Sequence, residues 1–432
     1  DSYQQKPVKR PAIKLPLTKG VVVPPRPKDP KAAYHYDDFV DCYVKYGKHN
    51  PNWDKVVVEI MASLADYYAH RKKWTKEMCL QLRKKAEALY GRTRCSDGLF
   101  LYSMALIRHI TGDVMSSEYF DYLRKAKRSF EQWDYPKLRR FGCLRRIAAY
   151  YTMAYANSPK TIYREATGPY NEALELFAQY LQSDSISTRD LFLNSESMAR
   201  VGATVLGAKQ VAVNNVVDLL QKHKPDSAAL YAFLGARDIR KAWAARGGGY
   251  AGSVTQNGWA KFKEHLKDAE DKLSKAWQKD NSFSYPAEKM ISVCMGQNYG
   301  LDKMNLWYER AIAADKDNVS AASAKILYLL PRWHGSEEAA LKFARSLKVA
   351  AEEKKIDAQF AALLPQTHYH LWTGPRHKKS ETYWQNKEVW KEIEASFKVI
   401  FDSLNGKNKK NLSWYAAFSW KCKKWKESDW AF

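Results

Sequence analysis

Residues 306–330, LWYERAIAADKDNVSAASAKILYLL, contain two apolar stripes on either side of the polar break from Asp315 to Asn318. The apolar residues recur at helical spacing on both sides: Trp307, Ala311 and Ala314 before the break, and Val319, Ala322, Ile326 and Leu330 after it. A helix pair of this kind cannot bury its apolar face alone, so neighbouring pairs have to stack. The stretch therefore predicts a helical-repeat fold.

The same order of helix, polar break and helix recurs along the chain. It is found in 273–296 and 411–432, and further helical stretches cover 99–110, 116–133, 139–156, 170–181, 192–220 and 227–245. No window shows strand-like alternation beside a turn dipeptide. Because the units are degenerate and keep no strict period of about 34 residues, the sequence predicts an all-α, tetratricopeptide-like α-solenoid of degenerate helix-turn-helix repeats.

Residues 1–31 differ from the rest of the chain, because they hold seven of the 16 prolines and a basic excess. Proline removes backbone donors and favours extended conformations in the residue before it. We therefore expect an extended arm that is held by the body of the protein or by a partner. The predicted organisation is a proline-rich basic arm (1–31), an N-terminal helical repeat region (32–245) and a C-terminal tetratricopeptide-like region (246–432).

The two ends of the sequence raise further expectations. The chain begins at Asp1 with no Met and no apolar signal region, so either a leader was removed or the sequence starts late. This leans toward an extracytoplasmic location, periplasmic or secreted, in a bacterium. Ser428 with Asp429 predicts the N-cap and first turn of a helix that Phe432 cuts short, so we expect the chain to continue or its end to dock on something. No run approaches about 18 apolar residues, so no membrane span is predicted.

Motifs typical of enzymes and metal sites are missing. The six cysteines contain no C-x-x-C pair, which argues against a zinc ribbon or a thioredoxin-like site and leaves one or two disulfides open. The sequence has no G-x-S-x-G, no H-E-x-x-H and no kinase signature. It therefore predicts no enzyme, no cofactor and no metal.

Two clusters of residues could nevertheless be functional sites, and each also has a structural interpretation. In RGGGYAG (246–252) the glycines could cradle an anion, but a helix C-cap and a loop to a helix near Gln256 explain them more simply. Four histidines could form a metal cluster, although their spacing favours capped or exposed side chains: His334, His368, His370 and His377. An enzyme that uses both clusters would need them to converge in one pocket.

The formal net charge of +24 at pH 7 points to acidic partners. Basic clusters lie at 6–31, 71–73, 83–85, 139–146 and 407–426. Such a surface would attract nucleic acid, anionic lipid or acidic proteins, and the alternative is a merely solubilising surface. No nucleic-acid recognition motif is visible, so a protein partner is favoured over nucleic acid.

Two of these clusters carry candidate partner-binding residues. In the first, arginines alternate with apolar positions and predict an amphipathic helix with an exposed, arginine-rich side: Arg139, Arg140, Arg145 and Arg146. In the second, the aromatic and basic C-terminal tail carries Trp414, Trp420 and Trp425. We expect both sets to contact a partner.

The segments AWAARGGGYAGSVTQNGWAKFKEHLKDAEDKLSKAWQKD (242–280), AEKMISVCMG (287–296), LWYERAIAADKDN (306–318) and LLPRWHGSEEAALKFAR (329–345) follow one another in this order. Together they resemble an uncharacterised bacterial family with a tetratricopeptide-like helical domain. Its signature reads Pro-Arg-Trp-Gly-Gly-Ser, and His334 replaces the first Gly here. The resemblance implies an all-helical repeat fold and no activity.

The PRWHGS segment itself has a structural interpretation. Pro331 would end one helix, Gly335 would supply the turn, and Ser336 would cap the next helix. Trp333 would fill the gap between repeats, and Arg332 would tie the turn to a neighbouring carbonyl or carboxylate.

The sequence as a whole predicts a non-catalytic helical-repeat scaffold for protein–protein interaction, as an accessory or assembly subunit of a larger complex. The partner would have an acidic surface, and self-assembly or an anionic membrane surface remain open. The alternative is polyanion or nucleic-acid binding through basic helix faces, which a steep loss of binding with salt would reveal.

Overall fold

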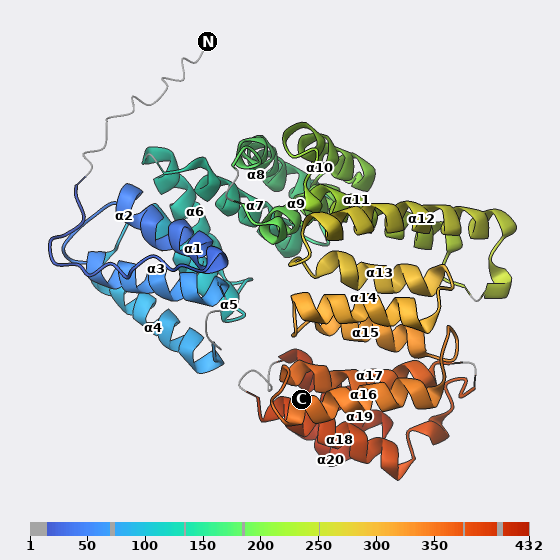
Figure 1. Ribbon diagram of the computed structural model, residues 1–432. Coiled ribbons are helices and arrows are strands. Elements are labelled where there is room, and N and C mark those ends of the chain that lie inside the picture. Colours follow the sequence, from blue (N-terminus) through green and yellow to red (C-terminus); the bar gives the residue numbers. More distant parts are fainter. Residues whose placement is uncertain are drawn as a thin grey trace. The chain divides into compact units, whose positions relative to one another are not determined.

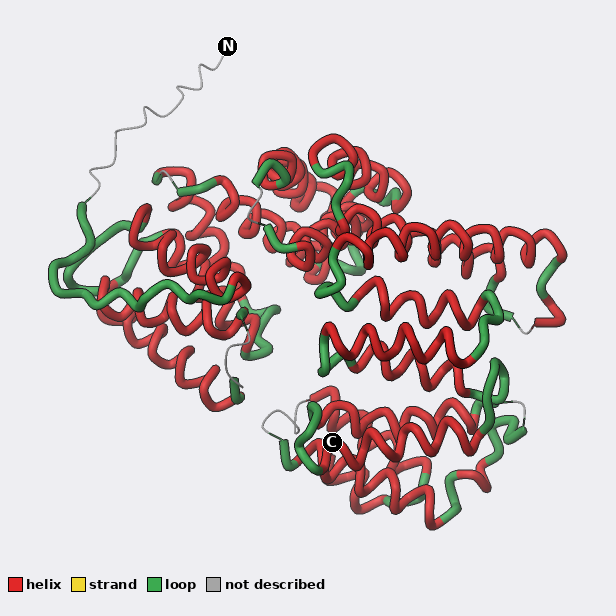
Figure 2. Tube along the Cα trace, viewed as in Figure 1, coloured by secondary structure: helices red, strands yellow, loops and turns green. Residues whose placement is uncertain are grey.

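The computed structural model describes residues 15–69, 74–133, 135–183, 186–249, 251–374, 376–403 and 409–431. Within these ranges the regular elements are helices and none is a strand, as Figure 2 shows. The chain divides into two compact units, Asp1–Pro225 and Asp226–Phe432. The predicted all-helical class is confirmed.

The first unit runs from α1 to α10. Its helices are α1 (Pro30–Tyr36), α2 (Cys42–Tyr46), α3 (Asp54–Tyr68), α4 (Lys76–Thr93), α5 (Gly98–Ile110), α6 (Ser117–Gln132), α7 (Lys137–Ala154), α8 (Pro159–Tyr180), α9 (Thr188–Val205) and α10 (Lys209–His223). A short π-helical segment, η1 (Asp37–Asp41), lies between α1 and α2.

The second unit runs from α11 to α20. Its helices are α11 (Ala228–Arg246), α12 (Gln256–Lys279), α13 (Tyr285–Gly296), α14 (Leu301–Ala314), α15 (Val319–Leu329), α16 (Glu337–Glu352), α17 (Leu363–Trp372), α18 (Lys387–Phe401), α19 (Lys409–Lys421) and α20 (Trp425–Ala431), with short turns η2 (Ala251–Ser253), η3 (Ala358–Ala362) and η4 (Glu381–Tyr383).

Within each unit a helix packs on the next helix and, in several places, on the next but one. In the first unit α7 contacts α8 and α9, and in the second α13 contacts α14 and α15. Figure 1 shows α12 to α15 lying one after another as successive layers. Packing between sequence neighbours is the property that defines a solenoid, so the tetratricopeptide-like α-solenoid is confirmed.

Local capping explains where many of these helices begin. Polar side chains accept hydrogen bonds from backbone N–H groups of the first turn: Thr75, Asp97, Ser116, Ser187, Ser227, Thr255, Asn318 and Ser336. Each such cap contributes roughly 1 kcal/mol. The caps limit each helix to a length that its apolar stripe can bury against its neighbours.

The boundary between the units lies earlier than the predicted 245/246. It falls before α11, because α11 packs along the length of α12. Gly235 permits this approach, since a Cβ there would lie 2.7 Å from Cγ of Leu273 on α12. The α11–α12 pair therefore belongs to the second unit.

The described part of the N-terminal arm lies against its own unit. Thr18 donates from its backbone N–H and from Oγ to Oδ2 of Asp54, at 3.0 and 2.6 Å. Arg26 pairs with Asp37 at 2.7 Å. The expectation that the body holds the arm is confirmed for residues 15–29, whereas residues 1–14 lie outside the described part of the chain.

Some predicted helices have other bounds in the structure. The helix expected at 170–181 starts at Pro159 and continues through Pro169, because its buried face runs unbroken on both sides of that proline. The stretch 192–220 is two helices, which separate at Gly207 with φ of 62°. The predicted N-cap at Ser428 is wrong: α20 already begins at Trp425, and Ser428 is buried, where its Oγ donates to the Ala416 carbonyl at 3.3 Å.

The interiors are aromatic and apolar, and they contain the cysteines. All six are buried free thiols, so no disulfide forms among them. Among the described residues, no helix is long and apolar enough to span a membrane.

Candidate functional site

Helix α7 carries the four arginines that the sequence singled out. It packs against α6, α8 and α9, so most of its circumference is covered by neighbouring helices. The predicted exposed side is therefore wrong: Arg139 is only 6% exposed, and the other arginines are partly buried. Helical spacing places Arg139, Gly142 and Arg146 on one face of α7.

This face lines a cavity of about 150 Å³ inside the first unit. Tyrosines from four other helices complete the wall: Tyr34 of α1, Tyr68 of α3, Tyr102 of α5 and Tyr180 of α8. The α7 arginines in the wall are Arg139, Arg145 and Arg146, and Arg140 points elsewhere, to Glu172 of α8. We call this the α7 pocket. The sequence indicated its arginines but not the tyrosines, which come from separate helices.

The three arginines of the α7 pocket have different partners. Arg139 forms an ion pair with Asp38. Arg145 donates from Nη1 to Oγ of Ser197 at 2.6 Å, and its Nε is buried without a hydrogen-bond partner. Arg146 donates from Nε to the Tyr102 hydroxyl at 3.2 Å. Within the part of the chain that the structure describes, neither Arg145 nor Arg146 has a carboxylate partner.

The positive charge of these arginines shifts the titration of nearby groups. Burial, and after it the charge of Arg146, lowers the pKa of Arg145 to about 10. Burial, together with Arg146 and Arg145, lowers the pKa of His109 to about 4, so this imidazole is neutral at pH 7. Burial raises the pKa of Tyr68 to about 12, so its phenol keeps its proton. The pocket is therefore positively charged and lined by neutral phenols.

Two phenols can donate a hydrogen bond. Tyr102 accepts from Arg146 and Tyr180 accepts from Nδ2 of Asn194 at 3.0 Å, so each keeps its own O–H as a donor. Gly142 lets Tyr102 approach α7, because a Cβ at this position would lie 2.8 Å from the Tyr102 oxygen. A glycine within an arginine-rich helix is the sequence signal that could have indicated this close approach.

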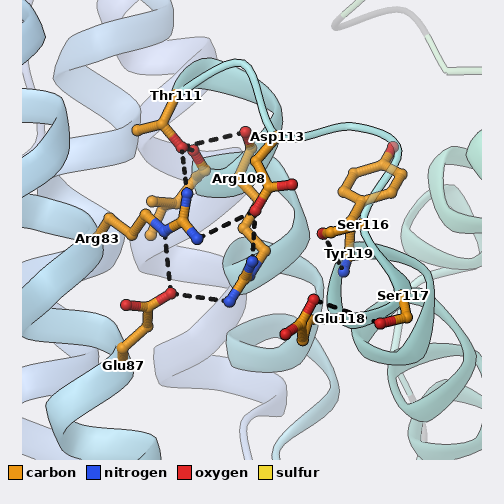
Figure 3. Close-up of polar contacts among 10 residues, drawn as sticks. Arg83, Glu87, Arg108, Thr111, Asp113, Ser116, Ser117, Glu118 and Tyr119 are labelled. Carbon is orange, nitrogen blue, oxygen red and sulfur yellow. Dashed lines mark hydrogen bonds and ion pairs between the residues drawn. The ribbon is translucent and has the colours of Figure 1, made fainter.

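Two other arginines of the same unit, Arg83 and Arg108, form ion pairs with carboxylates (Figure 3), although Nε of Arg108 is buried without a hydrogen-bond partner. Arg83 of α4 donates to Glu87 at 2.9 Å and to Asp113 at 3.0 Å. Arg108 of α5 donates to the same two carboxylates. We call this set the α4–α5 network. Its two positive and two negative charges balance, and it joins α4 to α5 and to the loop that follows α5.

The C-terminal tryptophans lie at the surface. Trp414, Trp420 and Trp425 are 40%, 60% and 53% exposed. The rings of Trp420 and Trp425 contact each other, with their centroids 6.4 Å apart. The lysines interleaved with them are Lys421, Lys423, Lys424 and Lys426. We call these tryptophans and lysines the α19–α20 surface.

A groove of about 790 Å³ borders this surface between α18, α19 and α20. Its wall is apolar at Phe401, Tyr415 and Trp430, and both acidic and basic side chains surround these rings. The groove is much larger than the α7 pocket, and it shares Lys426 with the α19–α20 surface.

The PRWHGS segment is a turn between α15 and α16, in which Gly335 and Ser336 have the predicted roles. Ser336 caps α16 by accepting from the Ala339 N–H at 3.0 Å. Gly335 is required, because a Cβ there would lie 2.1 Å from the Leu329 carbonyl oxygen. Nη2 of Arg332 lies 3.4 Å from Nδ1 of His370, and Nε2 of His334 lies 2.7 Å from the Met295 carbonyl. Pro331 follows the end of α15 after one residue.

Trp333 packs with two other tryptophans around the Arg246 guanidinium, in agreement with the prediction that it fills a gap between repeats. The guanidinium of Arg246 lies 5.3 to 5.6 Å from the ring centres of Trp243, Trp259 and Trp333. Nη1 of Arg246 donates to the carbonyls of Gly247 and Gly249. Gly247 ends α11 with φ of 75°, and α12 begins at Gln256. The simpler interpretation of 246–252, a helix C-cap and loop, is confirmed.

The four histidines make separate structural contacts. His368 is buried between Tyr383 and Glu392, with 2.8 Å to each. His377 lies 3.1 Å from Glu337. Across the described ranges, no group of three or more His, Cys, Asp or Glu is arranged to hold a metal ion.

No protein-family model matches the chain, and no curated protein sequence matches it. The resemblance to an uncharacterised bacterial family stays a prediction. Among solved structures, the human IFIT1 dimer with PPP-AAAA aligns over 96% of this chain and 94% of that chain, at 14% identity and a TM-score of 0.26. At this TM-score the likeness carries no information on the site.

Proposed function

We propose that the protein is a non-catalytic helical-repeat scaffold that binds a protein partner with an acidic surface, as an accessory or assembly subunit of a larger complex. The observation that carries this proposal is the α19–α20 surface, where large aromatic rings are exposed among lysines. Tryptophan is enriched among the residues that dominate binding energy at protein interfaces.

The physical basis is burial combined with charge. An aromatic side chain buries about 150–250 Å² when it is fully covered, and at about 25 cal/mol per Å² this is a large favourable term. Trp420 is 60% exposed and Trp425 is 53% exposed, so much of this area remains in water. The neighbouring lysines would speed association with acidic groups and disfavour basic partners.

The alternative function, polyanion or nucleic-acid binding, is supported by the net charge of +24. Such binding arises from many phosphate contacts and weakens steeply with salt. An acidic protein partner held through tryptophans would depend less on salt, because the burial of apolar area is not screened. Salt dependence therefore separates the two functions.

The experiment compares the wild type with Trp420→Ala/Trp425→Ala in affinity capture from native extracts, followed by direct binding measurements with each captured protein. Tyr163→Ala is the control, since Tyr163 is 64% exposed on α8 in the first unit. We expect an acidic protein whose affinity falls at least tenfold in the double variant and stays unchanged in the control.

A parallel titration uses a fluorescent 20-nucleotide RNA and a fluorescent polyglutamate at 50 and 150 mM NaCl. RNA binding that survives the tryptophan substitutions and disappears at 150 mM salt, without a captured acidic protein, would favour the polyanion function. Sedimentation of the wild type alone, and with anionic vesicles, reports on self-assembly and membrane binding.

A further inference from the structure

The α7 pocket is lined by three arginines and two aspartates, so its lining carries one positive charge in excess. Arg139 is neutralised by Asp38, but Arg145 and Arg146 are adjacent in sequence and have no carboxylate partner among the described residues. Bringing a charge out of water without a partner is unfavourable, and a like charge beside it adds to the penalty. An anion in the pocket would remove both penalties.

Donors are available for such an anion. A guanidinium has five N–H groups. Arg145 donates to Ser197, and Arg146 donates to Tyr102 and hydrogen-bonds Tyr119, so each arginine has more N–H groups than these bonds use. The buried Nε of Arg145 makes none. The O–H groups of Tyr102 and Tyr180 add neutral donors from α5 and α8.

The pocket's own carboxylates limit the charge that it can accept. Asp38 is paired with Arg139, and Asp190 lies in the first turn of α9, where its Oδ2 accepts from Oγ of the N-cap Ser187 at 2.6 Å. Both acids remain in the wall. A group with one negative charge matches the single positive charge that the lining has in excess.

The volume limits the size of the ligand group. Water occupies about 30 Å³ per molecule in the liquid, so a cavity of about 150 Å³ has room for about five waters. A single oxyanion with its nearest atoms fits this space. A planar guanidinium group can donate two parallel N–H···O hydrogen bonds to a carboxylate or a phosphoryl group, so both kinds of oxyanion suit the arginines of the pocket.

We infer that the α7 pocket is a binding site for one oxyanion group, a phosphoryl or a carboxylate group, held by Arg145 and Arg146 with Tyr102 and Tyr180 as neutral donors. This site is independent of the α19–α20 surface and of the function proposed for it. It lies within one unit, and each of its elements belongs to residues 34–194.

The test measures binding to the full chain by calorimetry and by the shift of the thermal midpoint. The probes are inorganic phosphate, O-phosphoserine, acetate and glutamate, each against chloride at equal ionic strength. Phosphate and phosphoserine report the phosphoryl group, and acetate and glutamate report the carboxylate. We expect one pair to bind with a saturable 1:1 isotherm and to raise the midpoint above that in chloride.

The variants locate the site. Arg145→Gln should weaken this binding at least tenfold, and Arg145→Lys, which keeps the charge but loses the planar fork, should weaken it severalfold. The matched control is Arg164→Gln, because the Arg164 side chain is 74% exposed on α8. Circular dichroism checks that each variant is folded, and Arg145→Lys decides the outcome if Arg145→Gln does not fold.

Either of two results would overturn the inference. One is a thermal midpoint that no probe raises more than chloride does. The other is binding of a probe to Arg145→Gln, or to Arg145→Lys if only that variant folds, with the affinity of the wild type.

Discussion

The α4–α5 network and the α7 pocket place the same residue type in two electrostatic environments of one unit. In the network, Arg83 and Arg108 share Glu87 and Asp113, and the charges balance (Figure 3). In the pocket, the nearest hydrogen-bond partners of Arg145 and Arg146 are the hydroxyl groups of Ser197 and Tyr102, and neither arginine forms an ion pair with Asp38 or Asp190 of the wall. The difference teaches that an arginine paired within the fold serves the fold, whereas a partly buried and unpaired arginine is available to a ligand.

The largest expected effect comes from breaking the network. Asp113→Ala leaves Arg108, whose side chain is only 10% exposed, with half of its carboxylate partners. Removing one member of a largely buried ion-pair network is strongly destabilising, and we expect a loss of about 2–3 kcal/mol in the free energy of unfolding, measured by urea denaturation. The control is Asp121→Ala, which removes a more exposed pair with Lys125 and should change stability by less than about 1 kcal/mol. Equal effects of the two substitutions would contradict the structural role of the network.

The network should also respond to acid. Burial raises the pKa of Asp113, but the hydrogen bond from Ser116 and the Arg108 guanidinium more than offset it, and the pKa lies below its ordinary value. The stabilising contribution is therefore complete above the unfolded pKa of about 3.9 and is lost as the pH falls through the folded pKa. The difference in thermal midpoint between the wild type and Asp113→Asn should shrink from pH 5 toward pH 2. A difference that stays constant over this range would show that the carboxylate charge is not what stabilises the network.

The pocket should respond in the opposite direction to loss of an arginine. Arg145→Gln removes a positive charge from beside Arg146 and lowers the desolvation penalty, at the cost of the Nη1 hydrogen bond to Ser197. In buffer without phosphate or carboxylate we expect no loss of stability and a gain of up to about 1 kcal/mol, by urea denaturation. A loss comparable to that of Asp113→Ala would mean that Arg145 supports the fold as the network arginines do.

The smallest effect is expected at Gly142. Gly142→Ala places a methyl group 2.8 Å from the Tyr102 oxygen, so the phenol has to move. The gain of about 1 kcal/mol in helix propensity offsets this strain, so stability should stay nearly unchanged. Because Tyr102 positions Arg146, oxyanion affinity should fall severalfold in calorimetry. Gly91→Ala is the control, since a Cβ at Gly91 on α4 meets nothing within 4 Å.

Much of the fold could be predicted from the sequence. The polar break at 315–318 separates α14 from α15 as predicted, and Ser336 caps α16. These features are local: a cap, a break and an apolar stripe act within one or two helical turns. Two helix starts were predicted wrongly, at Ser428 and just after Pro169. Ser428 is buried within α20, and α8 has buried residues on either side of Pro169, so in both places packing against neighbouring helices outweighed the local sequence signal.

The candidate sites could be predicted only in part. Trp414, Trp420 and Trp425 are exposed, and their predicted contact with a partner stays a prediction. The arginines of α7 were predicted as a binding set on an exposed helix face, whereas three of them line an internal pocket. Their environment depends on Tyr34, Tyr68, Tyr102 and Tyr180, which are contributed by helices far apart in sequence.

The sequence by itself determined the helical class, the repeat-like order of helices and the excess of positive charge, because periodicity, capping and composition are properties of short segments. Only the tertiary structure decided which arginines are matched with carboxylates. A solenoid helix is covered by neighbours on several sides, so its amphipathic pattern does not reveal whether a charged face meets water, an acidic side chain or a cavity. What the charged face of α7 meets depends on how α1, α3, α5 and α8 pack around it, and only the tertiary structure defines this packing.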